Sequence, residues 1–396
     1  YIYHRFRMKI FITVGIFPPD IGGPASFVPK IADLLIKSNH EVKVLCLSNE
    51  KNKEHYNYEV FRVLRSLPKV IRWPQTIFKM IKYGRKADLW FINGLPMESY
   101  ISHKFINLIL RRKIITIRKI VGDWAWERGR NLNLTEDSFD EFQRKKHSLH
   151  LEIAKFSRGW TANKVDKVIV PSQHLKNVVN NWGVFDGKID VIYNGTKIIQ
   201  KDPSSTSKDV RIISVGRLAP WKNLDVIIDA IETLNNNGNK KYTLTLVGDG
   251  PIRKKLENRI NLKSLQNLIS ITGQIPSNKV DDYLKKADIY IQASGYEGLP
   301  HVILEAINNK LTIISTPIGG TNEILEDGKY GWVLPLVDNK KPDSKELTKL
   351  IDKVEKNKKE DNKIREKAYE MLKVKFDENI NLNKYIEIIN NFNQGK

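Results

Sequence analysis

Two glutamates in the stretch 294–306 are candidates for acid–base catalysis or for binding a ligand. Seven residues separate Glu297 from Glu305, and a glycine and a proline lie between them. An apolar run at 287–293 predicts a buried strand, and Pro300 suits the first position of the helix that follows it. Glu297 would then lie in the turn before the helix, and Glu305 about one and a half turns inside it.

The start of that helix predicts a site for a phosphate, because free N–H groups and the positive end of the helix dipole attract anions. Glu305 would accept hydrogen bonds from hydroxyl groups of the same ligand. The alternative is a capped amphipathic helix that carries two solvated glutamates. We interpret the stretch as a binding site for a phosphorylated, hydroxyl-bearing molecule.

Two cations lie in an earlier loop, 216–224, between a predicted strand and a helical pattern at 225–231. Arg217 offers a planar fork of donors and Lys222 a compact positive charge, a combination that suits the oxygens of a diphosphate. By themselves, two basic loop residues are more often surface charges. A glycine-rich segment, Val-Gly-Asp-Gly-Pro at 247–251, follows before the two-glutamate stretch.

In this order, the basic loop, the glycine-rich segment and the two-glutamate stretch resemble the C-terminal domain of family 4 glycosyltransferases. The resemblance is strong over residues 191–332 and looser before them. It implies the α/β class, with two Rossmann-like doubly wound domains that face a central cleft (the GT-B fold) and C-terminal helices. It also implies an N-terminal acceptor-binding domain at 1–196, a nucleotide-sugar-binding domain at 197–375, and a C-terminal helix at 376–396 that packs back toward the first domain.

The resemblance assigns roles to individual residues. Arg217 and Lys222 correspond to ligands of the donor diphosphate, Glu305 to the residue that holds the ribose hydroxyls, and Glu297 to a carboxylate that contacts the donor sugar. The remaining implied donor-binding residues are the backbone around Gly298, Leu299, Pro300 and His301, the base-binding loop at Gly273, and Gly22 and Gly23 in an N-terminal loop over the phosphates.

The implied reaction moves a sugar from a UDP- or GDP-sugar to a hydroxyl of a glycan, glycolipid or lipid-linked precursor, with retained anomeric configuration. No Asp-x-Asp occurs in the chain, so we expect Arg217, Lys222 and the helix start to stabilise the leaving group without a metal or other cofactor. Two alternatives stay open. One is a GT-B-fold sugar-nucleotide epimerase or hydrolase, and the other is a basic nucleic-acid-binding protein, although the resemblance implies no nucleic acid partner.

The first domain departs from the family pattern after its predicted strand at 113–120. Many members have a histidine there, whereas this chain has Asp123 within the run 118–127. Asp123 is a candidate for contacting the donor sugar or the acceptor, and a helix N-cap is the alternative. Arg118, Lys119 and Glu127 are weaker candidates.

The net charge of +21 points to acidic partners, namely a nucleotide-sugar, an anionic membrane surface or nucleic acid. Residues 60–87 contain eight cations and no acid, and the segment 74–83 within them predicts a helix with Lys79, Lys82 and Lys86 on one face. An interfacial membrane helix and a helix packed on the sheet with a solvated basic face are both open. The chain lacks a signal-peptide pattern and a membrane-spanning apolar run, so we expect a cytoplasmic protein, with the inner face of the plasma membrane as an alternative site.

The elements that must position these residues are predicted from short apolar runs. They indicate strands at 8–14, 40–47, 87–92, 113–120, 165–170 and 189–193, and again at 210–215, 242–247, 268–272, 287–293 and 311–316. Helical patterns follow most of these runs, which is typical of parallel sheets covered on both faces. Residues 1–7 predict an extension, 201–208 a linker, and 344–393 Lys/Glu-rich helices.

Two further features of the sequence do not indicate a separate catalytic or dinucleotide-binding site. Cys46 is the single cysteine and lies in an apolar run, which predicts a buried structural thiol. Gly22 and Gly23 follow the first strand and would also fit a dinucleotide site, but the G-x-G-x-x-G spacing is absent.

Overall fold

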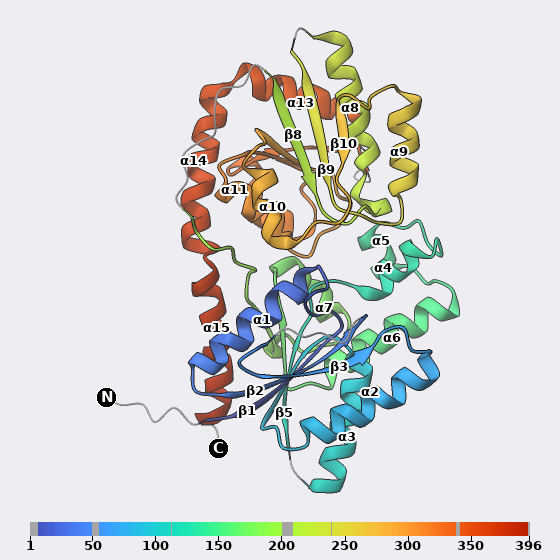
Figure 1. Ribbon diagram of the computed structural model, residues 1–396, viewed down its shortest axis with the longest axis vertical. Coiled ribbons are helices and arrows are strands. Elements are labelled where there is room, and N and C mark those ends of the chain that lie inside the picture. Colours follow the sequence, from blue (N-terminus) through green and yellow to red (C-terminus); the bar gives the residue numbers. More distant parts are fainter. Residues whose placement is uncertain are drawn as a thin grey trace.

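The structure, a computed structural model, describes residues 7–49, 55–111, 113–199, 209–238, 240–337 and 341–394. Over these residues the chain forms two parallel sheets, each covered by helices on both faces, with a column of C-terminal helices along one side (Figure 1). Residues 1–6 of the predicted extension and the predicted linker 201–208 lie outside the described residues.

In the described part of the chain, the first sheet has seven strands in the order β3-β2-β1-β4-β5-β6-β7, and neighbouring strands pair in parallel. Its strands are β1 (Lys9–Val14), β2 (Glu41–Ser48), β3 (Glu59–Leu64), β4 (Leu89–Asn93), β5 (Ile115–Lys119), β6 (Lys167–Val170) and β7 (Ile189–Val191). Its helices are α1 (Gly23–Lys37), α2 (Lys69–Gly84), α3 (Pro96–Leu110), α4 (Trp124–Asn131), α5 (Phe139–Arg144), α6 (Leu149–Asn163), α7 (Gln173–Asn181) and the 3₁₀ turn η1 (Asp186–Lys188).

The second sheet has six strands in the described residues, in the order β10-β9-β8-β11-β12-β13. Its strands are β8 (Val210–Val215), β9 (Tyr242–Val247), β10 (Ile269–Ile271), β11 (Ile289–Gln292), β12 (Thr312–Ser315) and β13 (Trp332–Val333), followed by the antiparallel pair β14 (Leu336–Val337) and β15 (Lys341–Pro342). Its helical segments are η2 (Pro220–Lys222), α8 (Leu224–Asn237), α9 (Arg253–Leu262), α10 (Ser277–Leu284), α11 (His301–Asn308), η3 (Gly319–Thr321), α12 (Asn322–Leu325), η4 (Glu326–Gly328), α13 (Ser344–Lys356) and α14 (Lys358–Lys375).

The predicted α/β class with two doubly wound sheets is confirmed, and the predicted strands agree with the observed ones to within about two residues. β3 was not predicted. It is an edge strand with charges at Glu59 and Arg62, and most of its residues are only partly buried, so it lacks the continuous apolar run of the central strands. The predicted helices over 344–393 are confirmed as α13, α14 and the last helix, α15 (Glu378–Gln394).

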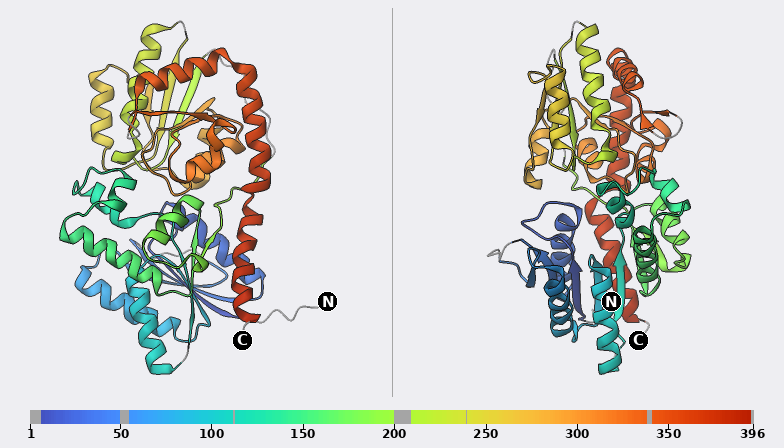
Figure 2. Two further views of the ribbon diagram at one scale, coloured as in Figure 1. Left: turned by 180° about the vertical axis from the view of Figure 1, so that it is seen from behind. Right: turned by 90° about the vertical axis from the view of Figure 1, so that its right-hand side faces the viewer.

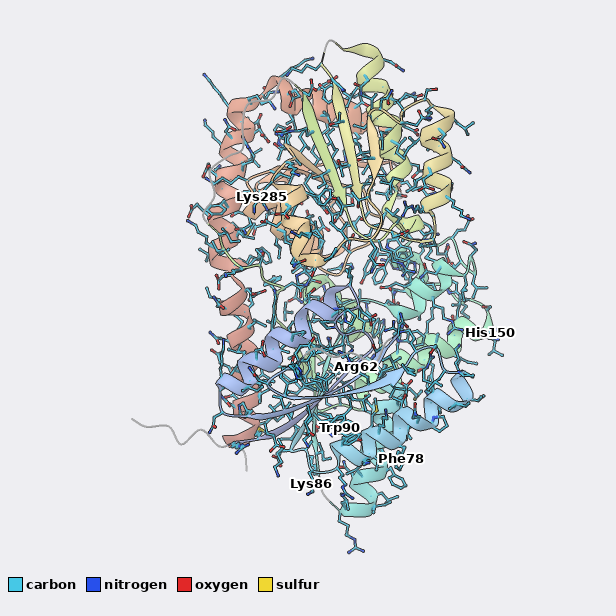
Figure 3. All side chains as sticks on the ribbon, viewed as in Figure 1. Arg62, Phe78, Lys86, Trp90, His150 and Lys285 are labelled. Carbon is cyan, nitrogen blue, oxygen red and sulfur yellow. The ribbon has the colours of Figure 1, made fainter. Side chains whose placement is uncertain are left out.

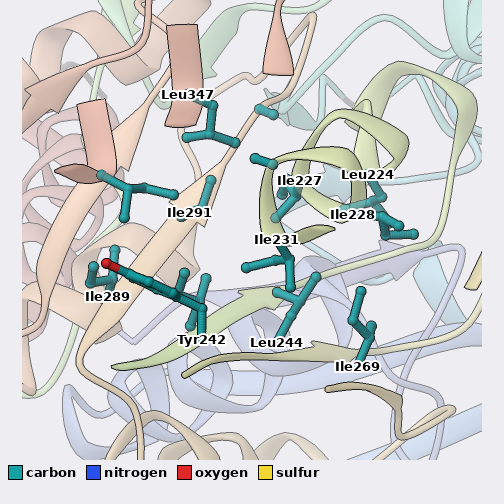
Figure 4. Packing of buried hydrophobic residues seen from close by; sticks show 14 of the residues in the cluster. Leu224, Ile227, Ile228, Ile231, Tyr242, Leu244, Ile269, Ile289, Ile291 and Leu347 are labelled. Carbon is teal, nitrogen blue, oxygen red and sulfur yellow. The ribbon is translucent and has the colours of Figure 1, made fainter. Parts of the chain in front are cut away.

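The core of the second sheet shows why its sequence alternates between strand and helix patterns. On α8, Ile227, Ile228 and Ile231 recur at helical spacing and are all fully buried against the sheet. Leu244 of β9 and Ile289 of β11 meet them from the sheet (Figure 4). The two periodicities therefore build one continuous core.

The last helix, α15, leaves the second sheet and lies against the first. Tyr385, Ile386 and Ile389 are buried in the same cluster as residues of β1, β2 and α1. Both views of Figure 2 place α15 alongside the lower sheet, below α14. The chain thus crosses between the two sheets a second time, after the connection at 192–209.

Aromatic side chains join the two halves on the other side of the molecule. Phe139 of α5 stacks on Tyr296, with ring centroids 3.7 Å apart and planes 12° apart. Trp126 of α4 lies 5.2 Å from Trp221 and 5.3 Å from Tyr296, measured between ring centroids. These residues share one buried cluster, so the two halves contact through packed rings.

The strand order places the loops that carry the predicted site. In both sheets the strand order reverses direction beside the first strand. The reversal lies between β1 and β4 in the first sheet and between β8 and β11 in the second. Ligands of doubly wound sheets bind at such switch points, beyond the carboxyl ends of the strands. The loops after β1, β8 and β11 hold the glycine pair, the two cations and Glu297.

Two other predictions concern single features. Cys46 is a free, buried thiol, as predicted, and burial raises its pKa to about 11. Within the described ranges, no helix combines the length and the apolar character needed to cross a membrane.

We expect Ile389→Ala to destabilise the protein by about 2 to 5 kcal/mol, because Ile389 is fully buried and its removal leaves a cavity between α15 and the first sheet. Urea unfolding of both proteins would measure the change. Ile380→Ala is the matched control, since Ile380 lies on the same helix but is 47% exposed. Equal loss in both variants would contradict the packing of α15 described above.

Candidate active site

A cavity of about 530 Å³ lies where the two sheets face each other, and both halves of the chain line it. The first half contributes the start of α1 and the end of β5. The second half contributes the loops after β8 and β9, the loop before α10, and the first turns of α11. The lining also includes one face of α15, so the cavity is a cleft closed at one side by the C-terminal helix.

Of the predicted site residues, six line this cavity: Gly22, Gly23, Arg217, His301 and Glu305, together with Lys119 from the weaker candidates. Gly22 is the N-cap of α1 and has a φ of 151°, a conformation that L residues with side chains rarely adopt. A Cβ there would also overlap the side chain of Ile16. The backbone at the start of α1 therefore faces the cavity without a side chain in front of it.

The two-glutamate stretch forms the predicted turn and helix, with one shift. α11 begins at His301, and Pro300 is its N-cap instead of its first residue, because ψ of Pro300 is 117° and therefore extended. Glu297 lies in the turn between β11 and α11, as predicted. The free N–H groups at the helix start accordingly belong to His301 and the residues after it, and His301 lines the cavity.

Glu305 lies one turn into α11 with its carboxyl group largely removed from water. Burial raises the pKa of Glu305 to about 7, although the nearby ammonium of Lys30 lowers it. Burial also lowers the pKa of His301 to about 3, with Lys119 and Lys30 acting in the same direction. At neutral pH the imidazole is therefore uncharged, and Glu305 is a carboxyl group close to its titration point.

Lys222 and Glu297 form an ion pair beside the cavity. The ammonium of Lys222 bonds to Glu297 Oε1, and the hydroxyl of Ser294 donates to the same oxygen at 2.8 Å. The side chains of Lys222 and Glu297 are 19% and 15% exposed. Lys222 lies with Arg217 around a small hollow next to the main cavity, so the two cations are neighbours as predicted.

Glu127 of α4 joins this charged group from the first half of the chain. Burial raises the pKa of Glu127, Arg217 and Lys222 lower it, and Glu297 raises it. These mutual effects place the four charges near one another across the junction of the halves. Glu127 was among the weaker sequence candidates, and its proximity to the cations is a result of the tertiary structure.

Asp123 lies outside the lining of the cavity. Its carboxylate caps α4 by accepting hydrogen bonds from the backbone N–H groups of Ala125 and Trp126 at 3.0 and 3.4 Å, and it pairs with Arg158 and accepts a bond from Gln143 at 2.9 Å. The residue is fully buried. The N-cap interpretation is confirmed, and the fully occupied, buried carboxylate gives no support to a contact with donor or acceptor.

The remaining predicted residues form the walls behind the cavity. Gly298 packs against the other half of the chain, where a Cβ would overlap the carbonyl oxygen of Val121. The carbonyl of Leu299 accepts a hydrogen bond from Asn194 at 2.9 Å. Gly273 bridges to Gly248, and the residues directly after Gly273 reach the cavity in its place.

Several lining residues were not predicted from the sequence. They come from helices far apart in the chain, namely Ser26, Phe27 and Lys30 of α1 and Glu378, Asn381, Leu382 and Tyr385 of α15. No local motif marks them, because each looks like an ordinary helix residue and only the return of α15 to the first sheet brings them together. Lys30 pairs with Glu378 across these two helices.

Among the residues that the structure describes, no group of three or more His, Cys, Asp or Glu side chains is arranged to hold a metal ion.

Comparisons with known proteins concern both halves of the chain. Residues 196–371 match the family model of the glycosyl transferases group 1, and residues 21–198 match that of glycosyltransferase family 4. An uncharacterised glycosyltransferase of Methanocaldococcus jannaschii is 25% identical over 367 residues, which cover 87% of this chain and 90% of that protein. The amylovoran biosynthesis glycosyltransferase AmsD of Erwinia amylovora is 30% identical over 193 residues, which cover 46% of this chain and about half (54%) of AmsD.

A solved structure has the same fold over nearly the whole length. The HepE protein of Anabaena, crystallised with UDP and glucose, matches with a TM-score of 0.75 at 19% sequence identity, covering 97% of this chain and 99% of HepE. The architecture of two facing Rossmann-like domains, the GT-B fold, is therefore confirmed.

The pKa of Glu305 predicts a pH-dependent stability difference. The fold raises this pKa from the ordinary value of 4.5 to about 7, so between these pH values the folded state keeps a proton that the unfolded state has released. The wild type should lose stability relative to Glu305→Gln as the pH rises through this window. We expect similar melting temperatures near pH 4 and a higher one for the variant above pH 7.

Thermal unfolding from pH 4 to pH 8.5 would measure this difference. Glu360→Gln, at an exposed position of α14, is the matched control and should run parallel to the wild type. A difference between wild type and Glu305→Gln that stays constant with pH would show that Glu305 titrates alike in the folded and unfolded states.

Proposed function

This chain belongs to the family 4 glycosyltransferases, the glycosyl transferases group 1, and we propose that it transfers a hexosyl group from a UDP- or GDP-sugar to a hydroxyl of a glycan, glycolipid or lipid-linked precursor. We further propose that the anomeric configuration is retained and that neither a metal nor another cofactor takes part. The enzyme class follows from family membership, and the donor, acceptor and stereochemistry are the proposal.

The observation that carries the proposal is the cavity that Arg217, the start of α11 and Glu305 share. Arg217 and the N–H groups of α11 would bind the diphosphate, and Glu305, one turn further along the helix, would accept hydrogen bonds from the ribose. The loop at 274–277 lines the far side of the cavity and would hold the base.

The leaving group of such a transfer is a nucleoside diphosphate, whose oxygens gain charge as the bond to the sugar breaks. Arg217 and Lys222 supply positive charge on that side, and the helix start adds a partial charge. Lys222 and Ser294 both bond to Oε1 of Glu297 and so hold its carboxylate in place, and this carboxylate would contact the sugar hydroxyls. These groups place positive charge at the leaving group without a divalent cation, which is why we propose metal-independent transfer.

The comparisons support a uridine donor without deciding it. HepE was crystallised with UDP and with UDP-glucose, and it has the same fold over almost the whole chain. The name of AmsD, a relative over half of its length, refers to the synthesis of a polysaccharide. Both agree with a sugar transfer to a growing glycan.

We expect Arg217→Ala to lower kcat by about 10²- to 10³-fold, because it removes a preorganised cation from the developing charge on the leaving group. Initial rates with a panel of UDP- and GDP-sugars and a glycan or polyprenyl-phosphate-linked acceptor would measure the effect. Arg259→Ala is the matched control, since Arg259 lies on α9 in an exposed pair with Asp229 and outside the lining of the cavity.

The same assay tests the finer parts of the proposal. NMR of the product should show the anomeric configuration of the donor, and excess EDTA should leave the rate unchanged. An inverted product would contradict retention, loss of activity in EDTA would contradict metal independence, and full activity of Arg217→Ala would remove this residue from the site.

A basic and apolar surface of the first half supports a membrane-bound acceptor. We define the α2–α3 face by its exposed large apolar side chains: Val70, Ile71, Trp73 and Phe78 of α2 and Phe105, Leu108, Ile109 and Leu110 of α3. α2 and α3 pack side by side at the lower end of the molecule, away from the second sheet (Figure 1). Thr76 and Met80 pack inward, as expected for a helix packed on the sheet, while the apolar side chains of this face stay exposed, which supports the interfacial interpretation as a proposal.

Positive charge surrounds this apolar surface. α2 contains no acidic residue, and Lys82, Arg85 and Lys86 are exposed at its C-terminal end. Figure 3 shows Phe78 on α2 and Lys86 just beyond the end of this helix. Val70 and Phe78 are eight residues apart and so share one stripe, with Lys82 one turn further. Exposed apolar groups that insert and cations that meet anionic headgroups are the features of an interfacial membrane site. We propose that the α2–α3 face docks on an anionic lipid surface that carries the acceptor.

We expect the wild type to co-sediment with vesicles of phosphatidylcholine and phosphatidylglycerol, to bind phosphatidylcholine vesicles much less, and to be released by high salt. Changing both Phe78 and Leu108 to Ser should weaken binding by about tenfold or more, because two apolar anchors are lost. Leu262→Ser, an 87% exposed leucine on α9, is the matched control. Equal binding by all three proteins would contradict docking through this face.

A further inference from the structure

Lys119 is a buried ammonium group at the floor of the cavity. Lys119 is the last residue of β5, in the middle of the first sheet, and only 6% of its surface is exposed. The side chain lines the cavity, and its nitrogen lies 3.3 Å from the ring centroid of Phe27 and 5.2 Å from that of Tyr385. Aromatic faces attract a cation but do not neutralise it.

No carboxylate neutralises Lys119 within the described part of the chain. No acidic oxygen there lies within 4.0 Å of its nitrogen, and Glu378, the acid of α15 that lines the same cavity, is paired with Lys30. Burial lowers the pKa of Lys119 to about 7, which reflects the cost of holding this charge without a partner. A buried, unpaired lysine that faces a cavity is therefore only partly charged at neutral pH, and an anion from outside the chain that lies beside it would favour the charged form.

Tyr385 gives a second, independent observation at the same place. Tyr385 lines the cavity, and only 2% of its surface is exposed. Its hydroxyl group has no hydrogen-bond partner among the described residues. Buried hydroxyl groups are nearly always hydrogen-bonded, so this donor also lacks its natural partner. Lys119 and Tyr385 therefore present two unsatisfied donors to one region of the cavity, one from β5 and one from α15.

The start of α11 adds to the positive potential there. Both Lys119 and Lys30 lower the pKa of His301, the first residue of α11, so the two ammonium groups lie close to the positive end of that helix. Glu305, four residues further along α11, is the nearest carboxyl group on that helix, and with a pKa of about 7 it is only partly ionised at neutral pH. The local field consequently favours an anion between β5 and α11.

We propose that Lys119 and Tyr385 form an anion subsite that binds a phosphate group of the donor diphosphate from the half of the molecule that does not carry Arg217. This inference rests on the proposed function, because it takes the nucleotide-sugar as the ligand. The diphosphate then lies between cations of both halves, Lys119 from the first sheet and Arg217 from the second. Donor binding accordingly holds the two halves together through the phosphates.

Calorimetric titration of the full chain with UDP, GDP, uridine and guanosine tests the subsite. The variants are Lys119→Met, which removes the charge at similar length, and Tyr385→Phe, which removes only the hydroxyl. For whichever nucleotide the wild type binds, we expect Lys119→Met to weaken the diphosphate by about ten- to a hundredfold and Tyr385→Phe by several-fold. Binding of the matching nucleoside should stay unchanged.

Two matched controls exclude general effects of these substitutions. Lys37→Met removes an exposed ammonium from the end of α1, and Tyr58→Phe removes another buried hydroxyl without a partner in the described residues, one that lies away from the cavity. Both should bind the nucleotides like the wild type. The melting temperature of ligand-free Lys119→Met should equal or exceed that of the wild type, because a buried unpaired charge is lost, whereas a purely structural lysine would leave a less stable protein.

The outcomes separate this inference from the proposed function. Unchanged UDP and GDP affinity in both variants, or an equal loss for nucleotide and nucleoside, would overturn the subsite while leaving the transferase proposal intact. In a further titration with UDP-glucuronate, a loss of affinity in the variants for this ligand but not for UDP would overturn the diphosphate assignment and place a sugar carboxylate at Lys119. A wild type that binds neither UDP nor GDP would contradict the proposed function itself, and the subsite with it.

Discussion

The stacked rings that join the two halves are the contact on which the rest of the site depends. Trp126, Trp221 and Tyr296 pack together in one buried cluster, and each is directly followed in sequence by a charged residue of the site, namely Glu127, Lys222 and Glu297. Fixing the rings therefore fixes the backbone from which the charges project. Because the aromatic cluster buries a large apolar area between the halves, the charged group forms at a defined distance across the junction.

The charges of the site are divided between pairs that are already complete and cations that are not. Lys222 and Glu297 neutralise each other, and Lys30 and Glu378 do the same across α1 and α15. Arg217 and Lys119, in contrast, line the cavity without an ion pair to an acidic side chain among the described residues. The ion pairs hold side chains in place, while the two unpaired cations and the start of α11 leave a positive region that suits the two phosphates of a nucleotide-sugar.

The two ends of the first half have different surfaces, and this suits the two partners of a glycosyltransferase. The carboxyl ends of its strands face the cavity and the second sheet, whereas α2 and α3 present apolar and basic side chains at the lower end of the molecule. A lipid-linked acceptor would reach the cavity from the membrane side, and the donor would enter between the sheets.

The sequence by itself determined the features that depend on neighbouring residues. Continuous apolar runs predicted the buried strands, helical spacing predicted α8 and the C-terminal helices, and the motif residues Arg217, Lys222, Glu297 and Glu305 pointed to the correct loops and helix, with α11 starting one residue later than expected. The edge strand β3 was not predicted, because a half-exposed strand has no continuous apolar run. Only the tertiary structure decided that Asp123 is a buried cap, that Glu127 meets the cations, and that Lys119 and Tyr385 share one cavity. These residues come from elements far apart in the chain, and their environment is set by sheet order and by the return of α15, which no local periodicity encodes.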